Sequence, residues 1–182
     1  MKSFSLALWL VALGVCWSPG RLAAAQAGWN SVGLRGGLSA MSTESYLHQL
    51  EGFAVYQLPW ELRARSGFGV ATRFGVTAGV LKGNGDFSFI GSAGPGFSLG
   101  KTGFPLELDL GVSVTFLSCD TFGRRDYNGQ VQFSSHGGVN YRLTKRIGLG
   151  YRIQHMSNAG MNGFRNPGLN LHLFGVNWYF DP

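Results

Sequence analysis

Residues 106–116 read LELDLGVSVTF, and this stretch indicates the fold most clearly. Leucine, valine or phenylalanine stands at every even position, and the odd positions between them include Glu107, Asp109 and Ser113. Because successive side chains of a β-strand point to opposite faces, this alternation predicts a strand with one apolar and one polar face. The stretch also has about the length that a tilted strand needs to cross a bilayer.

The same period of two recurs along the chain. It predicts seven more strands, near residues 31–39, 49–58, 68–80, 87–99, 130–141, 147–154 and 174–180. Eight strands of about ten residues, an even number, are typical of the smallest outer-membrane barrels. The sequence therefore predicts an all-β fold, an eight-stranded antiparallel transmembrane β-barrel.

The polar faces of these strands carry charges of both signs. Three cations and three anions are predicted to point inward: Arg35, Arg73, Arg152, Glu51, Glu107 and Asp109. Such charges can pair inside a narrow barrel, whereas an unpaired buried charge is costly. A soluble lipocalin-like barrel would instead place its apolar residues inside. The pattern favours a barrel whose apolar face meets lipid.

Composition agrees with a membrane barrel. Charged residues make up 13% of the chain and aromatic residues 14%, whereas a water-soluble domain carries about 25% charged residues. The net charge of +6 is spread over turns and loops, which argues against a nucleic-acid partner.

The N-terminus predicts export. Lys2 precedes an apolar run over residues 4–17, and small residues follow at Ala23, Ala24 and Ala25. This order is typical of a secretory signal peptide, and the run is shorter than a transmembrane anchor requires. We expect a signal peptide over residues 1–25, cleaved near residues 25–27, and a barrel over residues 26–182 in the outer membrane of a Gram-negative bacterium.

With periplasmic termini, the strand order also predicts the connections. Short inner turns are expected near residues 59–66, 100–105 and 142–146, and outer loops near residues 40–46, 81–86, 117–128 and 158–167. Outer loops longer than inner turns are usual in such barrels.

The segment YRIQHMSNAGMNGFRNPGLNLH, residues 151–172, could carry chemistry. Strand parity places His155, Ser157 and Asn170 on the lipid face, at the outer end of one hairpin. Polar side chains on a lipid face need a reason. One reason is depth, because the free-energy cost of a polar side chain that faces lipid falls toward zero near the membrane–water interface. The other is a serine hydrolase that acts on a lipid.

In the hydrolase interpretation, His155 is the general base, Ser157 is the nucleophile, and a group on the neighbouring strand orients the imidazole. Asn158 and the backbone amides of Ala159 and Gly160 follow where oxyanion donors are needed.

These motifs, His155-Met-Ser157-Asn158-Ala-Gly and Asn166-Pro-Gly168, resemble the active-site hairpin of the PagL family of lipid A 3-O-deacylases. The resemblance implies an outer-membrane esterase that removes the 3-hydroxyacyl chain at position 3 of lipid A, in lipopolysaccharide of the outer leaflet, without metal or cofactor. It implies His155 as base, Ser157 as nucleophile and an oxyanion hole at Asn158. The family pattern expects a glutamate where this chain has Asn170, so Asn170 would orient His155 without adding charge.

Two other functions remain open: a passive structural or adhesin-type barrel, and a small-solute channel, which the filled interior of an eight-stranded barrel disfavours. Three further histidines lack the spacing of metal ligands, namely His48, His136 and His172. We expect no metal site, and the sequence is compatible with a homodimer.

Overall fold

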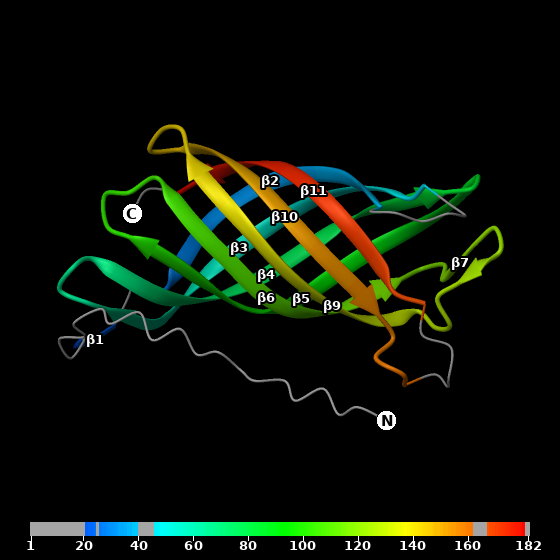
Figure 1. Ribbon diagram of the computed structural model, residues 1–182, viewed down its shortest axis with the longest axis horizontal. Coiled ribbons are helices and arrows are strands. Elements are labelled where there is room, and N and C mark those ends of the chain that lie inside the picture. The colour runs from blue at the N-terminus through cyan, green and yellow to red at the C-terminus, as the bar shows by residue number, and fades with distance from the viewer. Residues whose placement is uncertain (1–20, 25, 40–45, 162–166, 181–182) are drawn as a thin grey trace, which may run out of the picture.

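The chain forms a closed β-barrel in a computed structural model that describes residues 21–24, 26–39, 46–161 and 167–180 (Figure 1). The eight barrel strands are β2 (Gly28–Ser39), β3 (His48–Arg63), β4 (Phe68–Gly83), β5 (Asp86–Lys101), β6 (Leu106–Leu117), β9 (Val131–Arg142), β10 (Ile147–Ser157) and β11 (Leu169–Tyr179). Each strand pairs antiparallel with its neighbours, and β11 pairs with β2 to close the ring. The predicted eight-stranded antiparallel barrel is confirmed. Within the described ranges, no apolar helix has the length needed to cross a membrane.

Three shorter strands accompany the barrel. β1 (Arg21–Ala24) pairs with the end of β3, and β7 (Thr121–Phe122) forms a small hairpin with β8 (Arg125–Asp126) between β6 and β9. Residues 1–20 lie outside the described part of the chain, and β1 lies within the segment expected to be a signal peptide. The division into residues 1–25 and 26–182 therefore stays a prediction.

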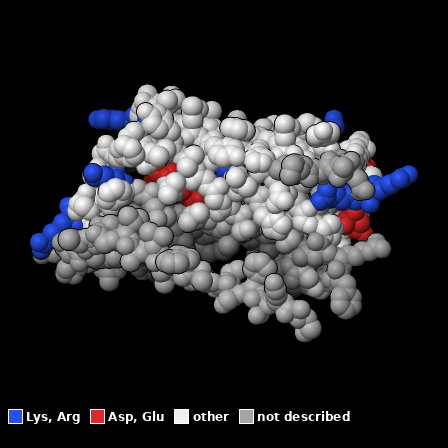
Figure 2. Space-filling model, in the orientation of Figure 1, with Lys and Arg blue, Asp and Glu red and all other residues white. Residues whose placement is uncertain are grey.

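The apolar face of each strand points outward. On β6, the alternate residues from Leu106 to Phe116 are 38% to 57% exposed. Ten residue steps of about 3.4 Å, on a strand tilted by about 40°, span about 26 Å, which matches the apolar band of an outer-membrane barrel. On the face in Figure 2, lysine and arginine side chains protrude at the two ends, and the band between is mostly uncharged.

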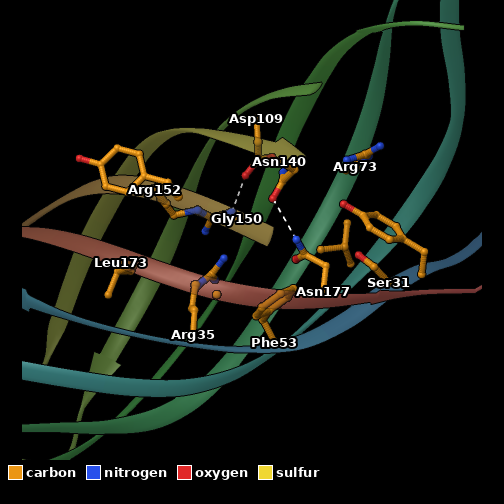
Figure 3. A pocket seen from close by; sticks show the side chains of 14 residues that line it. Ser31, Arg35, Phe53, Arg73, Asp109, Asn140, Gly150, Arg152, Leu173 and Asn177 are labelled. Atoms are coloured by element: carbon orange, nitrogen blue, oxygen red, sulfur yellow. Dashed lines mark hydrogen bonds and ion pairs between the residues drawn. The ribbon is translucent and has the colours of Figure 1, made fainter. Parts of the chain in front are cut away.

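The barrel interior holds the six predicted inward charges as three pairs. Arg35 pairs with Glu51, Arg73 with Glu107, and Arg152 with Asp109. Figure 3 shows Arg152 reaching Asp109, and Asn177 bonded to Asn140 beside them. Two interior cavities of about 30 and 40 Å³ lie among these groups. Cavities of this size hold one or a few waters, which disfavours passage of a solute.

An apolar cluster fills the outer end of the barrel. It gathers Leu47, Leu81, Ile90, Leu117, Phe122, Tyr127, Met156, Leu169, Leu171 and Leu173. Phe122 and Tyr127 come from the segment between β6 and β9, and their rings meet edge to face with centroids 6.0 Å apart. We call residues 118–130, which include β7 and β8, the capping loop.

Several predicted connections are shorter in the structure. The inner turn expected at residues 59–66 covers only residues 64–67, because β3 continues to Arg63 past a register shift between Gln57 and Glu61. This irregularity accommodates Pro59, which has no N–H to donate to the ladder. The outer loop expected at residues 81–86 is only a two-residue turn, in which Asn84 and Gly85 have φ angles of 52° and 88°.

Candidate active site

The hairpin of β10 and β11 brings the candidate residues together. His155 lies directly opposite Asn170 in the register of the two strands, and Met156 lies opposite Leu169. Met156 and Leu169 are buried in the interior, whereas His155 and Asn170 are exposed on the outer face. The residue parity read from the sequence is confirmed for this pair.

A hydrogen bond joins the pair. Nδ1 of His155 lies 2.7 Å from Oδ1 of Asn170. Because an amide oxygen only accepts hydrogen bonds, Nδ1 of the imidazole is the donor in this contact. A neutral His155 then carries its lone pair on Nε2, which is the arrangement that a general base needs.

Ser157 ends β10 two residues after His155 and is half-buried on the same side of the sheet. Alternate residues of a strand lie about 6 to 7 Å apart. No hydrogen bond between the Ser157 hydroxyl and His155 is found in the described part of the chain. Such contacts are often long without substrate and shorten in the substrate complex.

A tight turn follows Ser157. Met161 N–H donates to the carbonyl of Asn158 at 3.0 Å, and Ala159 and Gly160 have φ angles of 53° and 77°. These angles define a turn that an alanine rarely adopts, because its Cβ crowds the backbone there.

The two predicted oxyanion donors are engaged within the protein. Gly160 N–H donates to Oδ1 of Asn158 at 2.8 Å. Asn158 is buried, and its Nδ2 lies 3.4 Å from the carbonyl oxygens of both Tyr127 and Asn128. Among the described residues, no acceptor is found for Ala159 N–H, the donor between them.

The site lies near the outer edge of the apolar band. Eight residue steps separate His155 from Ile147 at the inner end of β10. They raise His155 by about 21 Å within a band about 25 Å tall. This is the depth at which acyl chains join lipid headgroups, and the desolvation penalty for His155 and Asn170 is small there.

Two further residues contact the site: Gly168, which belongs to the second motif quoted above, and Arg125, for which the sequence indicated no part in the site. A Cβ built on Gly168 would lie 2.6 Å from Cε1 of His155, so the backbone of Gly168 covers the imidazole. Nη2 of Arg125, in the capping loop, donates to the carbonyl of Gly168 at 2.5 Å. No local signal marks Arg125, because 43 residues separate it from Gly168.

The other histidines have separate surroundings. The Tyr151 hydroxyl lies 2.6 Å from Nδ1 of His172, and His136 contacts Asp109 at 3.4 Å inside the barrel. His48 is exposed at the start of β3. In the described ranges, no three His, Cys, Asp or Glu side chains gather as a metal site would require.

The closed eight-stranded barrel, its lipid-facing belt and the outward-facing hairpin define the class: the protein is an outer-membrane β-barrel. A family model described as "Lipid A 3-O-deacylase (PagL)" matches residues 23–179. The chain therefore belongs to the PagL family.

Three similar proteins add detail. A lipid A deacylase PagL from Bordetella bronchiseptica is 33% identical over 70 residues, which span 38% of this chain and 39% of that protein. The crystal structure of the outer membrane enzyme PagL superimposes with a TM-score of 0.68 at 16% identity, covering 82% of this chain and 99% of that one. Neisserial surface protein A gives a TM-score of 0.50 at 16% identity, over 86% and 100% of the two chains. The two structural likenesses bear on the fold alone.

Proposed function

We propose that this protein is a serine esterase that removes the 3-hydroxyacyl chain from position 3 of lipid A in the outer leaflet. One observation carries the proposal: His155 and Asn170 form a hydrogen-bonded pair on the lipid face, with Ser157 on the same face. A passive barrel has no need for a bonded imidazole at the depth of the lipid ester groups. Membership of the PagL family supports the same activity.

The proposed reaction has two steps. Ser157 Oγ attacks the ester carbonyl carbon while Nε2 of His155 takes the hydroxyl proton. The bond between the carbonyl carbon and the sugar oxygen then breaks, and His155 gives its proton to that oxygen. Water, deprotonated by His155, attacks the acyl group on Ser157, which releases the 3-hydroxy fatty acid and restores the serine.

We assign the oxyanion hole to the turn at Asn158 and Gly160, because its amides follow directly on the nucleophile. Ala159 N–H is the donor with the fewest competing contacts. Gly160 N–H would exchange Oδ1 of Asn158 for the developing oxyanion. The buried side chain of Asn158 would hold the turn in place through Tyr127 and Asn128. Donors arranged in this way stabilise the charge that develops in the transition state.

Mass spectrometry of lipid A tests this function. Wild-type protein, Ser157→Ala and Ser135→Ala are expressed in a Gram-negative host that lacks lipid A deacylation. Ser135 is the control because it is an exposed serine directly opposite His155 on β9. Wild type and Ser135→Ala should remove one 3-hydroxyacyl chain and release the fatty acid. Ser157→Ala should be inactive while it still runs as a folded, heat-modifiable barrel, because its nucleophile is gone.

Unaltered lipid A in cells that contain folded wild-type protein would contradict the proposal and favour the passive barrel. Deacylation by Ser157→Ala at the wild-type rate would contradict the serine mechanism and leave lipid A deacylation intact. Loss of a different acyl chain would contradict only the position on the sugar.

A further inference from the structure

The capping loop contacts both sides of the candidate site. On the side of β10, the carbonyls of Tyr127 and Asn128 face the amide of Asn158, which follows Ser157. On the side of β11, Arg125 donates to the carbonyl of Gly168, two residues before Asn170. Figure 1 shows the β7 hairpin of this loop at the end of the barrel where β11 begins.

Gly168 is in close contact with the imidazole of His155. A Cβ built there would lie 2.6 Å from Cε1 and 3.3 Å from Nε2 of His155. The first distance is shorter than carbon atoms tolerate, so only glycine fits without moving the ring. The backbone of Gly168 therefore forms a wall against one side of the general base, and Asn170 holds the ring through Nδ1.

Arg125 is itself held in place. Its guanidinium carbon lies 5.3 Å from the centre of the Tyr127 ring, and Tyr127 is completely buried against Phe122. Burial raises the pKa of Tyr127 to about 12, so this ring stays neutral under assay conditions. A cation over a neutral aromatic face is attracted to it. The donor to Gly168 thus extends from a fixed point in the apolar cluster.

From this chain of contacts, we infer that Arg125 is a positioning residue for His155, which it holds in place through the carbonyl of Gly168. The inference rests on the proposed esterase function. A different role for Arg125, binding a lipid phosphate through its guanidinium, predicts other results in the same experiment.

The test compares Arg125→Met with Arg124→Met. Arg124 is the matched control, because it is the preceding residue and is exposed. Turnover of a p-nitrophenyl alkanoate in detergent micelles is measured, together with the rate at which a fluorophosphonate labels Ser157. Neither probe carries a lipid A phosphate, so both report on the position of His155 and Ser157. Heat-modifiable migration in gels confirms that each variant is folded.

Misplacement of a catalytic group by about 1 Å can reduce the rate about 100-fold. We therefore expect Arg125→Met to lower kcat and the labelling rate by more than about threefold and up to about 100-fold, with KM within about twofold of wild type. Arg125→Lys should recover most of the loss, because an ammonium group still donates to a carbonyl. Arg124→Met should match wild type.

Gly168→Ala provides a second, independent variant. The added methyl group should push the imidazole aside and lower kcat without Arg125 being touched. If both residues act through the same wall, the double variant should lose little beyond the larger single loss. If the losses of the two single variants add up in the double variant, Arg125 and Gly168 affect His155 independently, and the inference is contradicted.

Other results would overturn the inference. Equal rates for Arg125→Met and Arg124→Met on both probes would contradict it, and so would a loss that Arg125→Met shows only through KM. If the same variants are also assayed on lipid A, a loss confined to that phosphate-bearing substrate would instead assign Arg125 to a substrate phosphate. If folded wild-type protein neither hydrolyses the ester nor reacts with the fluorophosphonate, the proposed esterase function itself fails, which is a separate result.

Discussion

According to the resemblance described above, Asn170 stands where a glutamate is expected. Its amide oxygen accepts from Nδ1 of His155 at 2.7 Å, so it fixes the ring and the tautomer. In the proposed reaction, a neutral amide would not offset the charge of the imidazolium that would form when His155 takes the serine proton. The pair therefore supplies geometry without charge stabilisation.

The first prediction concerns Asn170→Glu. The new carboxylate stabilises protonated His155. The base works only when it is neutral, so the acid limb of the rate profile should move to higher pH. Above neutral pH, the rate should equal or exceed that of wild type, because the carboxylate also stabilises the imidazolium in the transition state. The measurement is the rate of fatty acid release across the pH range.

Asn170→Ala is the companion variant. It removes the orienting oxygen from an exposed position, so the barrel should stay folded while turnover falls by about 10- to 100-fold. Wild-type turnover in the alanine variant would exclude Asn170 from the site. An acid limb that does not move in Asn170→Glu would show that the two side chains do not interact during turnover.

At the scale of the strands, ion pairs join one strand to another inside the barrel. Arg35 of β2 meets Glu51 of β3, and Glu51 also accepts from Gln49 at 2.8 Å. Glu51 is 3% exposed. Removing one partner of such a pair leaves an uncompensated buried charge, whereas removing both can be nearly neutral.

The second prediction is that Glu51→Ala lowers the free energy of unfolding by about 3 kcal/mol or more. The double variant Arg35→Met with Glu51→Leu should recover much of that loss. Glu61→Ala is the control, because Glu61 pairs with the more exposed Arg63 at the inner end of β3, and it should cost less than about 1 kcal/mol. Urea unfolding in lipid vesicles, followed by tryptophan fluorescence, measures all three. Equal losses for Glu51→Ala and Glu61→Ala would contradict a buried charge network.

The sequence predicted the strands well, because side chains along each strand alternate strictly between the lipid face and the barrel interior. The same parity predicted the six inward charges that form the three interior ion pairs, and the facing of His155 and Asn170, but not which charge pairs with which. Connections were predicted less well. The tight turn at Asn84-Gly85 could have been recognised, since Asn-Gly is a strong hairpin signal.

The contacts around the site could not be predicted from the sequence. The hydrogen bond from Arg125 to Gly168 joins segments that are distant in sequence, and no periodic pattern reports such a contact. The engaged donors at Gly160 and Asn158 depend on the conformation of one turn, which strand parity does not determine.

At the scale of the whole molecule, the described inner turns and the capping loop lie at opposite ends of the barrel. Residues 102–105 connect β5 to β6, and residues 143–146 connect β9 to β10, at the end away from β7. An orientation with periplasmic termini places the capping loop and the site at the cell surface, beside the outer leaflet.

The third prediction tests this orientation in a Cys119→Ser background, because Cys119 is a half-buried free cysteine. A membrane-impermeant maleimide should label Arg124→Cys on intact cells, since residue 124 is exposed in the capping loop. It should label Lys101→Cys only after the outer membrane is permeabilised. The reverse accessibility would invert the barrel and separate the site from lipopolysaccharide.

In the proposed function, the outward facing of His155 and Asn170 determines how a substrate would reach them. Because the two side chains open sideways onto the lipid belt, a lipid meets them by diffusing within the leaflet, in two dimensions. The quantity that governs the encounter is then the fraction of lipid molecules around the barrel that are substrate. In a detergent assay, extra detergent dilutes that fraction and slows the reaction, although the amount of substrate in the tube is unchanged. In the cell, the composition of the leaflet itself would set the pace of the reaction.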